Sequence, residues 1–393
     1  MTDSTDDIAV TFDADGLPMI PMLGLQPAWL QTRLEAALEP ELAIVDAHHH
    51  LWDRAGGYLL DALLADLGTT GTPGDPGASP PGHNVVATVY LQCAYGYRST
   101  GPVSLRPVGE TEFVASIARQ AVQRGVKTRV CAGIVGYADL ELGGEVDAVL
   151  QAHIDAAGGA RDGRFRGVRH ILARHDAFNA SLLGPAPRGL MQRANFRRGL
   201  ARLQALGLSF DAWLFHTQID ELVDLARAVP DLPIVLNHLG GPLAVGPYRG
   251  KRDEVFLIWR ESIKRLAACP NVSIKLGGLG MAIGGFEFHK QALPPSSEQL
   301  CAAWAPYMHA SIEAFGAERC MFESNFPVDK ATCSYGVLWN AYKRIAAGAS
   351  ASEKAWLFSD SAAKFYRLGN LTGNATGSAT VSATVIATNK DTT

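Results

Sequence analysis

Short apolar runs alternate with amphipathic stretches along most of the chain. The apolar runs are rich in β-branched residues and are bounded by turn residues, a pattern typical of buried strands. Between most of them, apolar residues recur every three or four positions, as in helices packed on a core. These helical stretches include residues 109–125, 196–207, 219–230 and 254–270. The predicted strands are residues 42–47, 84–92, 129–137, 165–172, 208–215, 232–238, 271–278 and 319–324.

Eight strands with intervening helices predict an α/β protein with a parallel sheet covered by helices. A (β/α)8 TIM barrel, which typically takes about 250 residues, accounts for this number of units. A doubly wound open sheet is the alternative. A dinucleotide-binding sheet of that kind has a glycine-rich turn after its first strand, whereas three histidines follow the first strand here.

The two ends of the chain do not share this pattern. Residues 1–40 are expected to be an irregular leader with one short helix at 27–40. Residues 68–83 are rich in Gly and Pro and predict a loop. After Leu368 the chain becomes a low-complexity mixture of Ala, Thr, Ser and Gly, so residues 369–393 are expected to be a disordered tail. The predicted barrel domain is therefore residues 41–368.

Composition narrows the class of protein. Hydrophobic residues make up 47% of the chain and charged residues 19%, which excludes global disorder. A net charge of −4 gives no electrostatic case for nucleic acid, and no run of about 18 apolar residues predicts a membrane span. The acidic, polar first residues lack the pattern of a signal peptide, so a cytoplasmic location is expected. The expected partners are a small-molecule substrate and, on general grounds, further copies of the chain in a homo-oligomer.

Three histidines stand where a barrel carries its active site, at the carboxyl ends of strands. Side chains alternate along an extended segment, so His48 and His50 face one side and His49 the other, where a surface position is expected. His238 follows the sixth predicted strand and precedes a Gly-rich turn. Because neutral imidazole is a common ligand for zinc and similar metals, His48, His50 and His238 predict a shared site.

The segments DAHHHLWD, LNHLGGP and FESNFP, in this order, resemble the amidohydrolase-related (type 2) family of TIM-barrel hydrolases. The chain is most similar to its lactonase-like branch, which includes 2-pyrone-4,6-dicarboxylate hydrolase and sugar lactonases. The resemblance covers residues 42–368 and implies a site built from a first-strand His-x-His, a sixth-strand His and an eighth-strand Asp. Members hydrolyse lactones or, in another branch, decarboxylate aromatic or muconate-like acids, some with zinc and some without metal.

The eighth strand departs from the family pattern. Residues 323–327 read Glu-Ser-Asn-Phe-Pro where the family has Gly-Ser-Asp-Trp-Pro, so Asn325 replaces the catalytic aspartate and cannot accept a proton. Alternation places residues 323 and 325 on the same face. We therefore expect that the carboxylate function has moved to Glu323. The alternatives are a Glu323 paired with Lys or Arg inside the barrel, and Asp329 as the base.

Other strand ends predict the substrate contacts. Lys275 lies within the seventh predicted strand, and it would hold a substrate carboxylate, polarise a substrate carbonyl or pair with Glu323. Arg169 lies in the fourth predicted strand and Arg174 lies just after it. Arginine suits bidentate binding of carboxylates. An anionic small molecule is therefore expected. The full set of predicted substrate contacts is Lys275, Arg169, Arg174, His216, Gln92 and Trp52.

Together these expectations predict an enzyme that hydrolyses a lactone or a related cyclic ester or amide with water. The predicted catalytic residues are Glu323, His238, Asn325 and Asp329, and the predicted ligands of one divalent ion, Zn or Mn, are His48, His50, His238 and Glu323. A metal-free mechanism stays open. The alternatives are a metal-dependent decarboxylase on the same scaffold and a non-catalytic barrel, which Asn325 favours. No GxSxG motif is present, so a serine nucleophile is disfavoured.

Overall fold

The computed structural model describes residues 17–54, 56–68, 82–161, 163–180 and 184–369. The first part of the predicted leader, most of the predicted loop at 68–83 and nearly all of the predicted tail lie outside the described residues. Within the described ranges, no helix is both long enough and apolar enough to span a membrane.

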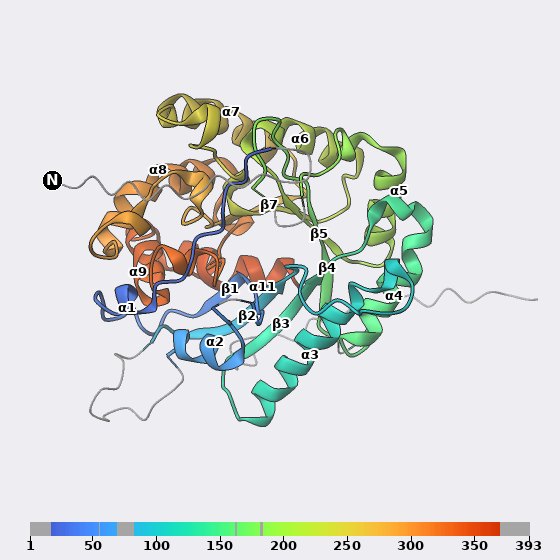
Figure 1. Cartoon of the computed structure of the whole chain (residues 1–393), viewed down its shortest axis with the longest axis horizontal. Helices are drawn as coiled ribbons and strands as arrows, with labels where there is room; N and C mark the ends of the chain where they lie inside the picture. Colours follow the sequence, from blue (N-terminus) through green and yellow to red (C-terminus); the bar gives the residue numbers. More distant parts are fainter. Residues whose placement is uncertain (1–16, 55, 69–81, 162, 181–183, 370–393) are drawn as a thin grey trace, which may run out of the picture.

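Eight parallel strands follow one another around a barrel, each paired with the next along the chain, which confirms the predicted (β/α)8 fold and excludes the doubly wound sheet (Figure 1). The barrel is brought to closure by a parallel bridge between His49 and Phe326. The strands are β1 Ile44–His49, β2 Val85–Leu91, β3 Arg129–Gly136, β4 Phe165–Ile171, β5 Ser209–Trp213, β6 Ile234–Leu236, β7 Val272–Leu276 and β8 Cys320–Phe322.

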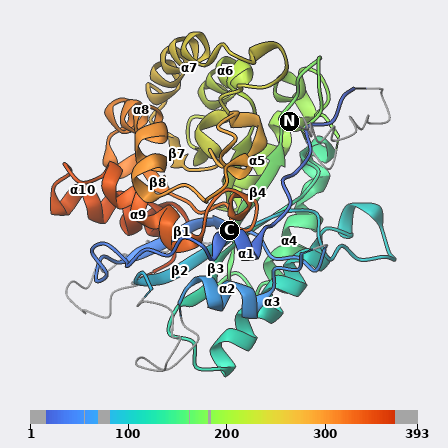
Figure 2. The ribbon, with the colours of Figure 1, turned by 60° about the vertical axis from the view of Figure 1, so that its left-hand side comes forward.

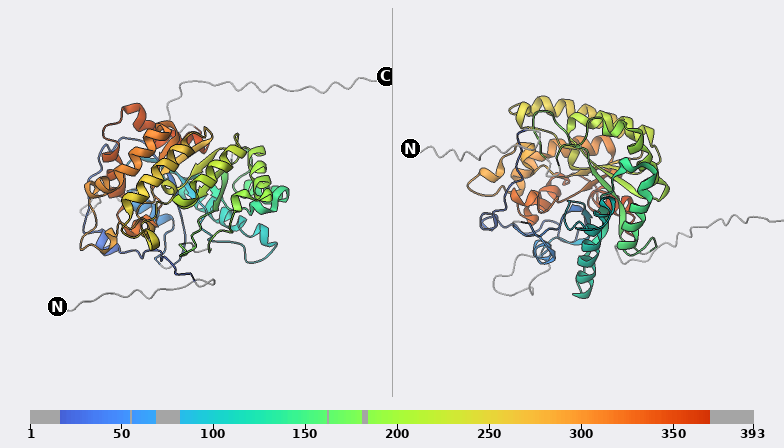
Figure 3. Two further views of the ribbon diagram at one scale, coloured as in Figure 1. Left: turned by 90° about the horizontal axis from the view of Figure 1, so that it is seen from above. Right: turned by 45° about the vertical axis from the view of Figure 1, so that its right-hand side comes forward.

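The helices form the outer layer, and Figures 2 and 3 show them surrounding the strands. Helices α7 to α10 cover one side of the barrel, and α3 and α4 cover the opposite side (Figure 2). The four helices predicted from periodicity are present as α3, α5, α6 and α7. The helices are α1 Pro27–Leu30, α2 Leu60–Asp66, α3 Val108–Gln123, α4 Val146–Ala156, α5 Ala194–Ala205, α6 Ile219–Ala228, α7 Arg252–Ala267, α8 Ser297–Phe315, α9 Tyr335–Ile345, α10 Ala351–Ala355 and α11 Ser361–Phe365.

The barrel interior is filled from below by the end of the folded chain. Tyr366 and Leu368 pack with Val45 and Val89 in an apolar cluster inside the strands. The guanidinium of Arg129, at the start of β3, donates to the Leu368 carbonyl, which fixes this segment at the amino-terminal ends of the strands. The opposite, carboxyl-terminal ends are left to form the mouth of the barrel.

The helix predicted at 27–40 is shorter than expected, since within these described residues only the turn Pro27–Leu30 is helix. The physical reason is that polar side chains of α9 capture the backbone that follows. Asn340 accepts from the Leu38 amide and donates to the Ala36 carbonyl, and Lys343 donates to the Leu38 carbonyl. Upstream of α1, the leader, in dark blue, runs across the face of the barrel in Figure 1.

Candidate active site

The carboxyl end of β1 is held where the barrel closes. The backbone N–H of Asn325 donates to the His48 carbonyl at 2.8 Å, and the backbone N–H of His50 donates to the Phe326 carbonyl at 2.7 Å. These backbone bonds join β1 to the segment after β8, so the predicted first-strand and eighth-strand groups meet. His48 and His50 both face inward, and their Nε2 atoms lie 3.2 Å apart.

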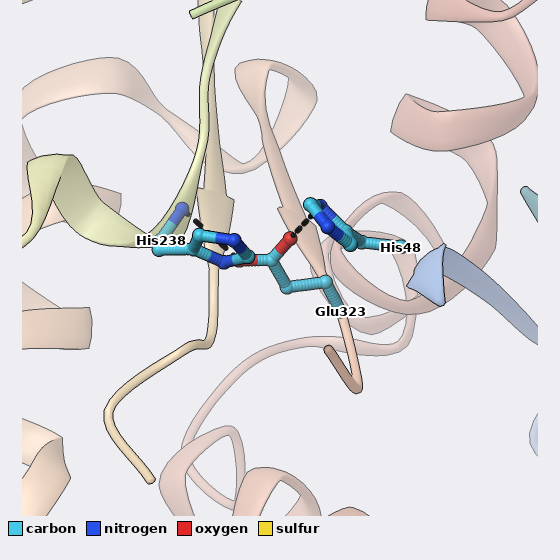
Figure 4. A group of neighbouring side chains, drawn as sticks. All are labelled: His48, His238 and Glu323. Atoms are coloured by element: carbon cyan, nitrogen blue, oxygen red, sulfur yellow. Dashed lines mark hydrogen bonds and ion pairs between the residues drawn. The ribbon is translucent and has the colours of Figure 1, made fainter. Parts of the chain in front are cut away.

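Glu323 lies between two imidazoles in the centre of the barrel (Figure 4). Its Oε1 accepts from His238 Nδ1 at 2.7 Å and from the His238 backbone amide at 3.1 Å. Its Oε2 lies 2.9 Å from His48 Nδ1. All three side chains are buried. Because a carboxylate oxygen accepts, His238 carries its proton on Nδ1 and has its lone pair on Nε2.

Two glycines after β7 make room for this arrangement. A Cβ on Gly277 would lie 2.4 Å from Glu323 Cγ, and a Cβ on Gly278 would lie 2.5 Å from His238 Cβ. Real Cβ atoms do not approach other heavy atoms this closely. His238 also has a left-handed backbone conformation, with φ of +54°, which is rare for a residue with a side chain. The Gly-Gly pair and this turn together set the place of the His238 ring.

A buried ion pair lies below the histidines. Lys275 Nζ donates to Asp211 Oδ2 at 2.9 Å and lies 3.2 Å from His48 Nδ1. Asn237 and the Tyr366 hydroxyl also donate to Asp211 Oδ2. Neither predicted role of Lys275, a substrate contact or a partner for Glu323, matches this geometry. The lysine is fully buried and its nearest carboxylate is Asp211, because β5 and β7 both point these side chains into the barrel interior.

Arg169 borders the site from β4. Its Nε donates to Gln92 Oε1, its Nη2 donates to the Gln92 carbonyl, and its Nη1 lies 3.3 Å from His48 Nε2. A guanidinium has five N–H donors, and one donor at each of three nitrogens is engaged, so two are left. Gln92, a predicted substrate contact, instead orients Arg169.

Burial controls the protonation of the site. It lowers the pKa of His48, His50 and His238 well below the ordinary value. The Arg169 cation acts in the same direction on all three, and Lys275 does so on His48 and His238. Burial raises the pKa of Glu323 to about 8, although Lys275 opposes the shift. The three imidazoles are therefore neutral at physiological pH, the state in which an imidazole accepts a proton or binds a metal.

A pocket of about 220 Å³ opens above this cluster. Its polar floor consists of His50, His238, Arg169 and Asn325. Asn325 donates from its amide nitrogen to Asp329 Oδ1 at 2.9 Å, which leaves its carbonyl oxygen as the free end of the side chain. His48, Glu323 and Lys275 lie below the floor and do not line the pocket.

Not all predicted site residues reach this pocket. Asp329 is buried behind Asn325, where it also accepts from the Gly280 amide, so it positions the asparagine instead of facing substrate. Arg174 bonds to the Ala186 carbonyl in a separate pocket. His216 accepts from the Leu243 amide and lies outside the main pocket. Of the predicted substrate contacts, Trp52 and Arg169 line it.

His49 is not on the surface as expected. It is fully buried, with its Nε2 3.8 Å from Cys131 Sγ and its ring against Tyr90. The alternation along β1 is as predicted, but the outer face of a barrel strand is covered by helices, so facing away from the interior does not mean facing solvent.

The donor atoms fit a divalent ion. One nitrogen each of His48 and His238 and one oxygen of Glu323 lie within 4.8 Å of one another, and Glu323 Oε2 is a buried oxygen with no hydrogen bond among the described residues. Neither tautomer of His48 satisfies all its contacts. If His48 Nε2 carries the proton, that N–H faces an N–H of Arg169. If Nδ1 carries the proton, the Nε2 lone pair faces the lone pair on His50 Nε2, because His50 donates from Nδ1 to the Leu91 carbonyl at 2.8 Å. A cation bound by these residues would remove the conflict.

Three parts of the site were not anticipated as functional: Asp211, Tyr366 and the leader. Asp211 has a sequence signal, since it is a lone carboxylate in an apolar strand and must find an inward-facing partner. Tyr366 stands next to the low-complexity tail and carries no signal of its own. Met19 and Leu23, from the leader, line the pocket although no pattern connects them with the barrel.

The active site of a (β/α)8 barrel enzyme lies at the carboxyl ends of its strands, and this chain gathers three histidines and Glu323 there. The sequence profile of the Amidohydrolase family matches residues 45–368, and the chain belongs to this family. The chain is therefore a hydrolase. Membership of this family excludes the alternative of a non-catalytic barrel.

Known relatives cover almost the same part of the chain. An uncharacterized protein, y4mH, of Sinorhizobium fredii is 34% identical, over 84% of this chain and 99% of its own length. An L-fucono-1,5-lactonase of Burkholderia ambifaria is 28% identical, over 82% of this chain and 95% of its own. A crystal structure of an amidohydrolase from Burkholderia multivorans has a TM-score of 0.61 at 24% identity, over 83% of this chain and all of that one. This likeness shows the shared fold.

Proposed function

We propose that the enzyme opens a lactone by attack of water, with His238 as the general base. The observation that carries this proposal is the place of His238, whose Nδ1 is held by Glu323 while its ring lines the pocket. The proposal is supported by the lactonase activity named for relatives at 28% and 27% identity. The proposed substrate is a small molecule whose ester carbonyl lies beside Arg169 in the pocket floor, and an anionic group on it stays a prediction.

In this mechanism, Glu323 is a positioning residue for the base. Its Oε1 accepts from Nδ1 and so fixes the His238 tautomer, with the Nε2 lone pair left to take a proton from water. Because burial raises the pKa of Glu323 to about 8, its negative charge favours the imidazolium increasingly as the pH rises toward that value. The water oxygen bonds to the lactone carbonyl carbon, and the ring C–O bond then breaks. The proton passes from His238 to the leaving alkoxide, so the product is a hydroxy acid.

Two groups of the floor assist the attack. The two remaining N–H donors of Arg169 stabilise the negative charge that develops on the carbonyl oxygen, as an oxyanion hole does. The free carbonyl oxygen of Asn325 accepts a hydrogen bond from the attacking water and orients it. A divalent ion held by His48 and Glu323 would supply Lewis-acid chemistry that lowers the pKa of water. His238 has one lone pair, on Nε2, so it either binds such an ion or acts as the base, and this mechanism uses it as the base.

The test is hydroxy-acid release from a panel of lactones by the purified enzyme and three variants. His238→Asn is expected to lower kcat by about 10²–10⁴-fold, the usual contribution of a general base. Glu323→Gln should lower kcat and alter the pH profile, while Asp329→Asn should have a smaller effect through Asn325. Full activity in Glu323→Gln together with loss in Asp329→Asn would contradict the assignment. Release of CO2 from aromatic acids, with no lactone opened, would instead identify a decarboxylase.

A further inference from the structure

The leader forms one wall of the pocket and is bonded in place. Met19 forms a β-bridge with Asn179, in the segment after β4. The Ile20 amide donates to the Asn179 carbonyl at 2.7 Å, and the Asn179 amide donates to the Pro18 carbonyl at 2.9 Å. Farther along, the Trp29 indole donates to the Gln291 carbonyl at 3.0 Å. The wall is thus part of the folded barrel mouth.

The chemistry of the wall contrasts with that of the floor. The leader contributes Met19, Ile20 and Leu23, and the segment after β7 contributes Met281 and Ile283. Among the described residues that line the pocket, the polar side chains apart from the tryptophan indoles belong to the floor or to its edge. A substrate seated on the floor therefore places its remaining atoms against methionine, leucine and isoleucine.

The polar groups at the edge of the pocket are mainly those of Arg54. Its Nη2 donates to the carbonyls of Cys93 and Ala94, so the N–H groups on Nε and Nη1 are what this edge offers a substrate. Its guanidinium also lies 5.7 Å from the ring of Trp52. A polyhydroxylated substrate would leave several hydroxyl groups without partners against this wall, and buried hydroxyls without partners are unfavourable.

We infer that the substrate is a lactone with an apolar body, such as an alkyl- or aryl-substituted ring, and not a sugar lactone. This inference rests on the proposed lactone hydrolysis and deepens it. The floor takes the ester group, and the wall formed by the leader and the segment after β7 takes the hydrocarbon part. The relatives named for a sugar lactone share the family, but the substrate specificity of this chain differs from theirs.

The experiment compares an alkyl-substituted δ-lactone with a polyhydroxylated δ-lactone of the same ring size. The alkyl compound should have a kcat/KM at least tenfold higher. Met19→Gln and Met281→Gln, which nearly keep side-chain volume, should reduce this preference severalfold, mainly through KM for the alkyl compound. Leu257→Gln, at an exposed apolar position of α7, is the matched control and should leave the preference unchanged.

A binding measurement separates this inference from the proposed function. Calorimetric titration with the cyclic ketones that correspond to the two lactones needs no turnover. Tighter binding of the alkyl ketone, weakened in Met19→Gln but not in Leu257→Gln, supports the inference even if neither lactone is opened. Equal binding, or a preference for the hydroxylated compounds, overturns it. Turnover of the sugar lactone alone would overturn it while upholding lactone hydrolysis.

Discussion

At the scale of single residues, the departure of the eighth strand from its family pattern has a geometric explanation. Glu323 cannot take the place of the missing aspartate at the pocket floor, because its carboxylate is held below by His48 and His238. Asn325 occupies the floor position instead, tied to Asp329. The carboxyl group is kept in the site, and in the proposed mechanism it acts on water through the imidazole of His238.

The cluster around His48 predicts metal binding at this scale. Protein purified without chelators is expected to contain about one divalent ion per chain, as in other sites with imidazole and carboxylate ligands. His48→Ala should lose this ion, measured by elemental analysis, because it removes a donor shared by the cluster. His175→Gln, a histidine in a separate pocket, is the control and should retain it. A folded, active, metal-free enzyme would contradict this prediction and leave Arg169 as the cation in the pocket floor.

At the scale of elements, the turn after β7 is the tightest constraint on the site. Gly277→Ala would bring a Cβ to 2.4 Å from Glu323 Cγ and 2.6 Å from the Glu323 carbonyl oxygen. Overpacking of this kind typically destabilises by about 1–3 kcal/mol. The displaced carboxylate should lower kcat at least tenfold, an effect that denaturant unfolding and kinetics measure separately.

The control for this variant is Gly336→Ala in α9, where a Cβ meets nothing within 4 Å. Alanine is favoured over glycine in a helix by up to about 1 kcal/mol, so this variant should be equally or more stable and fully active. Unchanged kcat in Gly277→Ala would contradict the positioning role of Glu323.

The elements also show how much of the fold and of the site can be predicted from the sequence. Period and strand-end position suffice to predict the barrel and the meeting of His48, His50 and His238, since both follow from local pattern and the rule for barrel strand ends. The sequence does not predict which side chain pairs with a buried charge. Lys275 pairs with Asp211 two strands away instead of Glu323 on the next strand, because the choice depends on the interior radius and side-chain length. Arg174 leaves the site because the loop after β4 turns away.

At the scale of the whole molecule, the leader and the barrel are joined by a pH-sensitive contact. His83 Nδ1 accepts from Lys343 Nζ at 2.8 Å, and Lys343 also holds the carbonyls of Leu38 and Glu39. Burial, together with Lys343, lowers the pKa of His83 from 6.5 to about 4. The unfolded chain therefore takes up this proton below pH 6.5, whereas the folded chain takes it up only near pH 4.

Stability from this contact is present above pH 6.5 and is lost as the pH falls toward 4, by at most about 3 kcal/mol. Glutamine at position 83 keeps a donor and an acceptor but does not titrate. His83→Gln should reduce proton uptake on unfolding between pH 6.5 and 4 by about one, measured from urea unfolding across this range. Identical pH dependence in the two proteins would show that His83 does not contribute.

The segments at the two ends of the barrel have a consequence for biosynthesis. Tyr366 and Leu368 complete the interior from below, and Tyr366 donates to the carboxylate that pairs with Lys275. Since domains form as the chain emerges from the ribosome, the barrel cannot finish its interior until residues 366–368 have been translated. The leader is synthesised before Asn179 and Asn340, so it cannot form its hydrogen bonds with them until those residues have been translated. A ribosome that stalls before residue 366 therefore releases a chain with an uncapped charge pair, which is a ready target for quality-control proteases.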